Sequence, residues 1–152
     1  MPPFIVKDLS REVPRSPFDT LDGIPWLPRL IDKARAMKAG KLGEYIPYPC
    51  GGDRHFLSTL GLDAAALRAQ IEADTPDEAI VHWVRSQLPV DGEARIARYK
   101  EQARTPVSGD MAQHLEEAKR ALQADRPTLS LAHVTNFAEL ICAEEGHPLP
   151  GG

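Results

Sequence analysis

One short segment, residues 43–53 (GEYIPYPCGGD), places ionisable and aromatic side chains on a backbone rich in glycine and proline. Glu44 and Asp53 offer carboxylates for acid and base work, Cys50 offers a nucleophilic thiol, and Tyr45 offers an aromatic face. Constrained loops of this kind often carry binding or catalytic groups. The segment is therefore the first candidate site, although no catalytic residue can be assigned in it.

Thiol chemistry at Cys50 would require a base or a cation close to the sulfur. His55 follows five residues later, Arg54 is near, and a helix is predicted to begin at Asp53. A zinc site from Cys50, Asp53 and His55 lacks the second pair of ligands that usual zinc patterns have. The two adjacent glycines do not have the spacing of a phosphate-binding loop. We therefore expect no metal and no cofactor.

A second candidate precedes this loop. Residues 29–41 carry five basic residues and one acid, which gives the segment a charge of +4 and leaves the rest of the chain at −8. Arg29, Asp32 and Lys33 follow the spacing of one helical face. The face is predicted either to bind an anion or an acidic partner, or simply to lie in solvent with local ion pairs.

Most of the chain shows the helical period rather than the alternation of strands. Thr75, Pro76 and Glu78 resemble a capping box at the start of a helix with Ile80, Trp83, Val84 and Leu88 on its inner face. The predicted helices are 27–39, a short one from Asp53 to Gly61, one from the cap Asp63 to about 73, 76–88, 92–104, one after Ser108, and one from Ser130 to Gly146. This pattern predicts an all-α fold, a single compact bundle of six or seven helices.

Prolines divide the chain into two parts. Eight of the 14 prolines lie within the first 49 residues, and proline removes backbone donors and fixes φ. Residues 1–26 are therefore predicted to form an extended N-terminal arm across a helical domain of residues 27–152, so that the chain is one domain overall. Trp26 at the end of the arm is predicted to be a core residue.

Composition excludes several classes of protein. The 152-residue chain has a formal net charge of −4, which argues against general nucleic-acid binding, and only two cysteines, which cannot form a disulfide framework. Apolar runs are too short to span a membrane, and the first residues do not resemble a secretory signal. We expect a cytoplasmic protein with no membrane partner.

Residues 27–63 also carry a family resemblance. The run LPRLIDKAR, the later GKLGEY, and then Cys50, Asp53, Gly61 and Asp63 resemble a bacterial family known as domain-of-unknown-function family 5069. DLSREVPRSP, DEAIVHWVR and NFAELICAEEGHPLP extend the resemblance to nearly the whole chain. Where family members tend to have Pro-Leu after the cysteine, this chain has Gly51 and Gly52. The resemblance implies a compact, mostly helical cytoplasmic domain and implies no activity.

Three functional hypotheses follow. The leading one is a small binding or interaction module whose anion-accepting site is formed by Arg29, Asp32 and Lys33 together with the 43–53 loop. The alternative is an enzyme that uses Cys50 as nucleophile, or Glu44 and Asp53 as acid and base. The third is a structural homodimer or larger homo-oligomer that packs through Val13, Phe18 and Trp26 of the arm.

Overall fold

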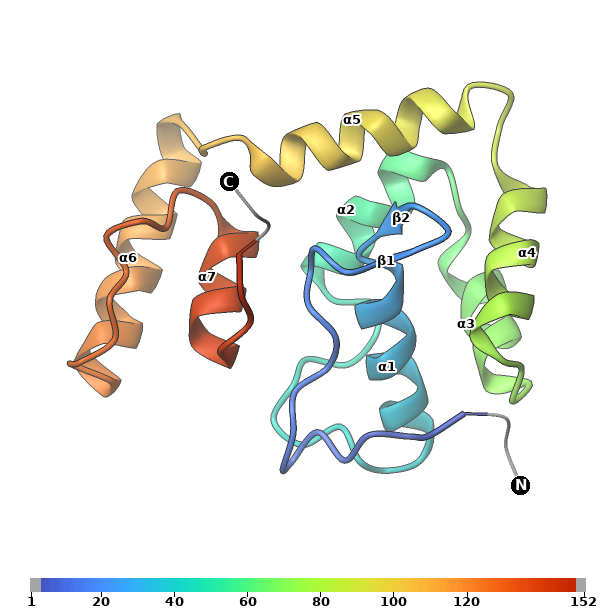
Figure 1. Ribbon diagram of the computed structural model, residues 1–152, viewed down its shortest axis with the longest axis horizontal. Helices are drawn as coiled ribbons and strands as arrows, with labels where there is room; N and C mark the ends of the chain where they lie inside the picture. Colours follow the sequence, from blue (N-terminus) through green and yellow to red (C-terminus); the bar gives the residue numbers. More distant parts are fainter. Residues whose placement is uncertain (1–3, 150–152) are drawn as a thin grey trace. The chain divides into compact units, whose positions relative to one another are not determined.

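The computed structural model describes residues 4–149, which form two compact units that divide between Tyr99 and Lys100 (Figure 1). About 55% of the described residues are helical, so the prediction of a mostly helical fold is confirmed. The described residues contain β1 (Thr20–Leu21), β2 (Ile24–Pro25), α1 (Leu27–Lys38), α2 (Gly51–Leu60), α3 (Ala64–Glu72), α4 (Asp77–Gln87), α5 (Gly92–Arg104), α6 (Gly109–Asp125) and α7 (Phe137–Glu145). Helix α5 crosses the division, and the sequence predicted no boundary there.

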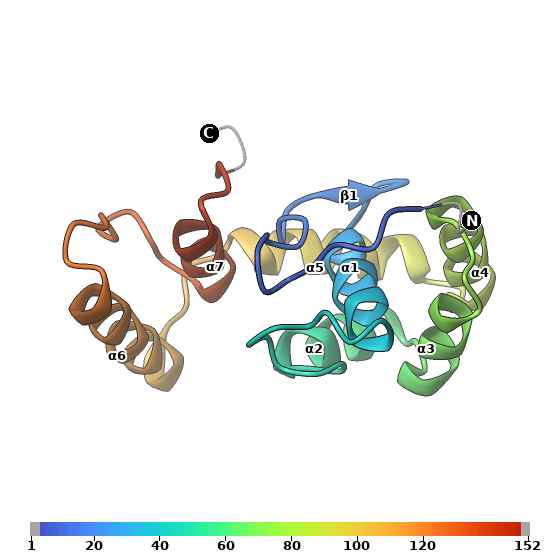
Figure 2. The same ribbon diagram turned by 90° about the horizontal axis from the view of Figure 1, so that it is seen from below.

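Helix α1 is the central element of the first unit. Every residue from Leu27 to Ala36 is buried, the charged ones included. The N-terminal segment runs alongside α1 in both views (Figures 1 and 2) and α3 contacts it as well. The interpretation of its basic face as a solvated surface is therefore wrong, because the arm and the following helices cover the face that periodicity assigned to solvent.

The N-terminal arm is held to this unit by backbone hydrogen bonds and burial. Its described residues contain no helix, but they contain turns at 9–12 and 17–18 and one short antiparallel hairpin in which Leu21 pairs with Ile24. Leu9 N donates to Lys41 O at 2.8 Å, and Leu9 is buried. Gly43 lies so close to this crossing that a Cβ there would meet Leu9 O at 2.7 Å. The arm is therefore part of the core.

Two predicted helix starts differ from the structure in the first unit. Asp63 caps α3 as predicted, since its carboxylate accepts a 2.8 Å bond from Ala66 N. Thr75, however, forms no capping box, because its hydroxyl donates to Gln70 O at 2.8 Å, and α4 begins at Asp77. Helix α2 begins at Gly51, two residues before the predicted start.

Fewer residues on the inner face of α4 are fully buried than the sequence predicted. Ile80 and Val84 are fully buried, whereas Trp83 and Leu88 are only half-buried. Leu88 lies beyond the last helical residue, in extended backbone, so helical periodicity does not govern its direction. The indole of Trp83 is therefore not a core anchor of this helix, in contrast to Trp26, which is buried as predicted.

The second unit has its own small core. Helices α6 and α7 contact each other and surround buried Leu115, Leu131, Val134 and Leu140. The predicted helix start at Ser130 is wrong, because α7 begins at Phe137, where the side chain of Asn136 accepts a 2.9 Å bond from Glu139 N. Asn136 also donates to Ala103 O at 3.0 Å, which fixes this cap against the end of α5. No helix within residues 4–149 combines the length and apolar character that crossing a membrane demands.

Candidate functional site

The two candidate segments meet in the first unit. Arg29 and Lys33 lie one turn apart on α1, and their cationic groups are each 5.9 Å from the centre of the Tyr45 ring. Lys33 Nζ also lies 3.4 Å from the sulfur of Cys50. The arrangement joins α1 to the loop that was predicted as a site from composition alone. We call the group of Trp26, Arg29, Lys33, Tyr45, Cys50 and Asp53 the α1–loop cluster.

Cys50 lies at the N-terminus of α2, at the capping position. Its backbone N–H donates to Asp53 Oδ2 at 3.0 Å, and its side chain faces the backbone N–H of Asp53, which makes a capping box. The sulfur thus sits where the helix presents unpaired N–H groups and a partial positive charge. The Cys50 side chain is half-buried and carries a free thiol.

Asp53 is completely buried and connects Cys50 to Trp26. The indole Nε1 of Trp26 donates to Asp53 Oδ1 at 2.8 Å. Trp26 precedes α1 with φ of 70°, a conformation that a bulky residue rarely adopts. Such strain persists only where the surroundings fix it, and it often occurs at functional sites. A Cβ at Gly52 would come within 2.6 Å of the Trp26 ring, so the glycine is required by this packing.

The charge balance of the cluster is incomplete around Lys33. Its side chain is only 4% exposed, yet Cys50 Sγ is the only hydrogen-bond acceptor that it has among the described residues. An ammonium group has three donors, and a neutral thiol is a weak acceptor. Burial of a charge without a matching anion costs several kcal/mol, on the order of the effective penalty per buried ion. The Lys33 ammonium therefore has N–H donors that could bind a further acceptor.

Two predicted site residues lie outside the cluster. Asp32 binds the arm, accepting from Arg15 N at 2.8 Å and from Arg15 Nη2 at 3.0 Å. Glu44 is exposed. The structure therefore brings together Arg29, Lys33, Tyr45, Cys50 and Asp53 but places Asp32 in a separate ion-pair network and Glu44 in solvent.

That network continues from Asp32 through Arg15 to α4. Arg15 Nη1 and Arg35 Nη1 donate to the two oxygens of Asp77 at 2.9 and 2.8 Å. Burial alone would raise the pKa of Asp77, but the hydrogen bond and charge of Arg15, together with Arg35, outweigh it and lower the pKa. The charges fasten the arm and α4 to α1, so this part of the basic segment has a structural role.

His55, the histidine closest to Cys50 in the sequence, packs against a different residue. The ring of His55 lies against Tyr99, with the ring centres 5.6 Å apart, and no hydrogen bond in the described chain joins it to the sulfur. The cationic neighbour of the thiol is Lys33 instead. Residues 4–149 contain no group of three histidine, cysteine, aspartate or glutamate side chains that could hold a metal ion.

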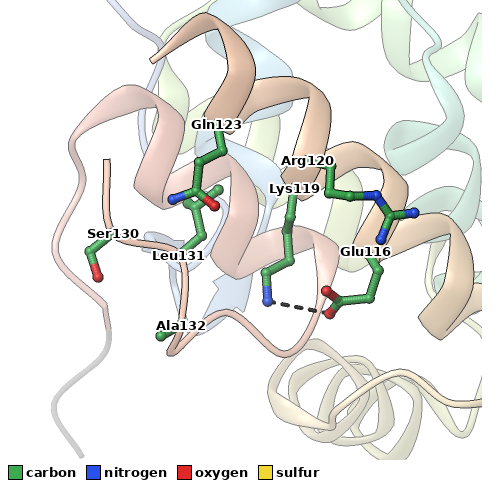
Figure 3. Close-up of a pocket in the computed structure, with 7 residues that line it drawn as sticks. All are labelled: Glu116, Lys119, Arg120, Gln123, Ser130, Leu131 and Ala132. Atoms are coloured by element: carbon green, nitrogen blue, oxygen red, sulfur yellow. Dashed lines mark hydrogen bonds and ion pairs between the residues drawn. The ribbon is translucent and has the colours of Figure 1, made fainter. Parts of the chain in front are cut away.

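The second unit has a cavity of about 320 Å³ between α6 and the loop before α7 (Figure 3). Its lining residues are Glu116, Lys119, Arg120, Gln123, Ser130, Leu131 and Ala132. Lys119 Nζ donates to Val134 O at 3.0 Å, and Gln123 Nε2 donates to Leu129 O at 2.7 Å. Because these polar groups already bind carbonyl groups of the loop, the cavity is a weaker candidate for a ligand site than the α1–loop cluster.

The sequence predicted Trp26 as a core residue, with the rim of a groove as the alternative. It did not predict Arg15 and Asp77 as the partners of the basic helix. No local pattern marks these residues, since Trp26 and Asp53 are 27 positions apart and Arg35 and Asp77 are 42 apart. The φ of Trp26 and its hydrogen bond to Asp53, both structural observations, distinguish it from an ordinary core tryptophan.

A comparison with protein-family models gives a match to residues 11–147, under the description "Domain of unknown function (DUF5069)". The chain belongs to this family. The match covers the arm from residue 11, both candidate segments of the first unit and the core of the second unit. A search of curated proteins finds no match to this DUF5069 chain.

Proposed function

We propose that this DUF5069 domain is a small binding module whose α1–loop cluster accepts an anion. The ligand class is a small phosphate-like or carboxylate anion, or an acidic side chain of a partner protein that carries the same group. Lys33 supplies the principal charge, Arg29 adds a second cation one turn away, and the N-terminus of α2 supplies backbone N–H groups.

One observation carries this proposal, namely the buried ammonium of Lys33, whose one hydrogen-bond acceptor within residues 4–149 is the Cys50 sulfur. A bound anion would satisfy the remaining donors and offset the cost of burying the charge. The segment's charge of +4 within an acidic chain also favours the approach of an anion.

The test is the thermal stability of the chain in phosphate and in sodium chloride at equal ionic strength. A ligand that binds only the native state raises stability by RT ln(1 + [L]/Kd), so phosphate should raise the Tm in excess of chloride. Lys33→Gln should abolish this excess. Since phosphate also stabilises proteins by exclusion from their surfaces, the excess must be compared between variants rather than taken alone.

Lys41→Gln is the matched control, because Lys41 is an exposed lysine of the same basic segment and its loss changes the net charge equally. The excess should survive this change, and it should survive Cys50→Ser. An equal response of the parent and the Lys33 variant would contradict the proposal. If Arg29→Gln removes the excess as well, both cations contribute to the site.

The same contact favours a second candidate function, nucleophilic chemistry by Cys50. Reactive cysteines lie beside cationic side chains and helix N-termini, and Cys50 has both. The rate of Cys50 alkylation by iodoacetamide, measured with Cys142 replaced by serine, tests this. The rate should fall when Lys33 is replaced by methionine, and an unchanged rate would exclude activation by Lys33.

We propose further that the module acts in the cytoplasm and does not bind nucleic acids generally, on the basis of its acidic composition and low cysteine content. The oligomer hypothesis has less support than the other two. Trp26 is buried within the chain itself, and Val13 and Phe18 are half-buried, so these three residues offer little apolar surface to a second copy. A mass measurement in solution tests this alternative.

A further inference from the structure

We infer that Cys50 and Lys33 form an oxidative modification site, in which peroxide joins the two side chains by a reversible sulfur–nitrogen bond. This inference needs only the contact between the two groups and does not rest on the anion-binding proposal. The two atoms are 3.4 Å apart, and the bond would connect α1 to the first residue before α2.

The geometry favours this reaction over reaction with another group. Cys50 is half-buried, so a small oxidant has access to the sulfur, whereas Lys33 is only 4% exposed, which leaves the oxidised sulfur as the nearest electrophile to its amine. The Lys33 side chain is restrained by its burial beside Tyr45, whose ring centre is 5.9 Å from Nζ. Proximity of this kind replaces a bimolecular step by an intramolecular one.

The reaction has two steps. Hydrogen peroxide first oxidises the Cys50 thiol to a sulfenic acid, and one water leaves. Lys33 then gives its extra proton to solvent, and the nitrogen lone pair attacks the sulfur, so that an S–N bond forms and the S–O bond breaks. The departing hydroxide takes a proton from the nitrogen and leaves as a second water. One thiol, one amine and one peroxide thus give one sulfenamide and two waters.

The product is reversible by thiols. Two molecules of a small thiol reduce the S–N bond, which returns the cysteine and the lysine and leaves the small thiol as its disulfide. Sulfenic acids that lack such a nearby nitrogen or thiol proceed to sulfinic acid, which ordinary thiols do not reduce. The lysine would therefore protect Cys50 from irreversible oxidation.

The experiment treats the full chain carrying Cys142→Ser with hydrogen peroxide and measures its mass. This background excludes a disulfide within the chain, which would cause the same loss of two hydrogens. The expected species is lighter than the reduced chain by two hydrogens and returns to the original mass with dithiothreitol. After trypsin, peptide 30–35, uncut after Lys33, should be joined to peptide 42–54.

Lys33→Arg is the matched variant, because it keeps the positive charge but removes the nucleophilic amine at that position. It should abolish the joined peptides and increase trapping of Cys50 sulfenic acid by dimedone, whereas Lys41→Arg should leave the bond unchanged. Three results would overturn the inference: Cys50 that resists peroxide, Cys50 that passes to sulfinic acid in the parent without an S–N species, or a bond to a different lysine. Because the readout is mass, a failure of the anion test leaves this result interpretable.

Discussion

Trp26 and Asp53, 27 positions apart in the sequence, are joined by a 2.8 Å hydrogen bond from the indole N–H to a completely buried carboxylate. The same carboxylate accepts from the backbone N–H of Cys50. The pair therefore fixes the start of α1 to the start of α2, and it determines where the thiol lies relative to the basic face of α1.

Replacement of Asp53 by alanine should destabilise the first unit. The change leaves the Trp26 N–H without its acceptor and removes the acidic member of the capping box, so we expect a loss of about 3 kcal/mol in the free energy of unfolding. Urea denaturation measures it. The control is Asp63→Ala, which removes an exposed helix cap and should cost only about 1 kcal/mol. Equal losses in the two variants would mean that the Trp26 contact contributes little.

The two adjacent glycines should respond differently to alanine. A methyl group at Gly52 would collide with the buried Trp26 ring, whereas one at Gly51 has no atom within 4 Å. We expect Gly52→Ala to cost about 1–3 kcal/mol, as overpacked cores do. Gly51→Ala should be neutral or stabilising by up to about 1 kcal/mol, because alanine is the better helix former. Thermal denaturation checks both, and near-ultraviolet circular dichroism should detect displacement of Trp26 only in the Gly52 variant.

Asp77 should contribute to the pH dependence of stability. Because the pKa of its carboxyl is lower in the folded chain than the usual 3.8, the contribution is fully present above that unfolded value. It is lost as the pH falls through the lower folded pKa. Asp77→Asn should therefore make the free energy of unfolding less sensitive to acid below about pH 4. Glu78→Gln, a change at the next and exposed residue, should leave the acid dependence as in the parent.

Lys33→Met distinguishes the two candidate functions by the sign of its effect on stability. If Cys50 is a neutral thiol and the site awaits an anion, removal of a poorly paired buried cation should be neutral or stabilising by about 1–4 kcal/mol. If Cys50 and Lys33 form an ion pair, removal of one partner should destabilise the chain by about 3–5 kcal/mol. Urea denaturation in chloride, without phosphate, provides the comparison. The anion-binding proposal predicts the first outcome.

The sequence predicted the helical segments where local interactions are sufficient. Periodicity located α1 and α5 closely, and Asp63 was identified as a cap because its carboxylate needs only the N–H three residues later. The same reasoning failed at Thr75 and Ser130. At Thr75, the hydroxyl donates to Gln70 O of the preceding helix, and α4 begins at Asp77 with Pro76 at the capping position.

For the site, the sequence by itself determined which groups could do chemistry, namely the cations of 29–41 and the thiol, ring and carboxylates of 43–53. Their arrangement depended on the tertiary structure. Helical spacing predicts that Asp32 and Lys33 are neighbours along α1, but it does not predict which segments cover each of them. Because the arm packs on one side of α1, Asp32 pairs with Arg15. Because the loop packs on the other side, Lys33 contacts the sulfur of Cys50. The charged face of α1 was predicted as a surface, because periodicity assigns charged residues to solvent. Burial by the arm and the loop makes it an interior site instead.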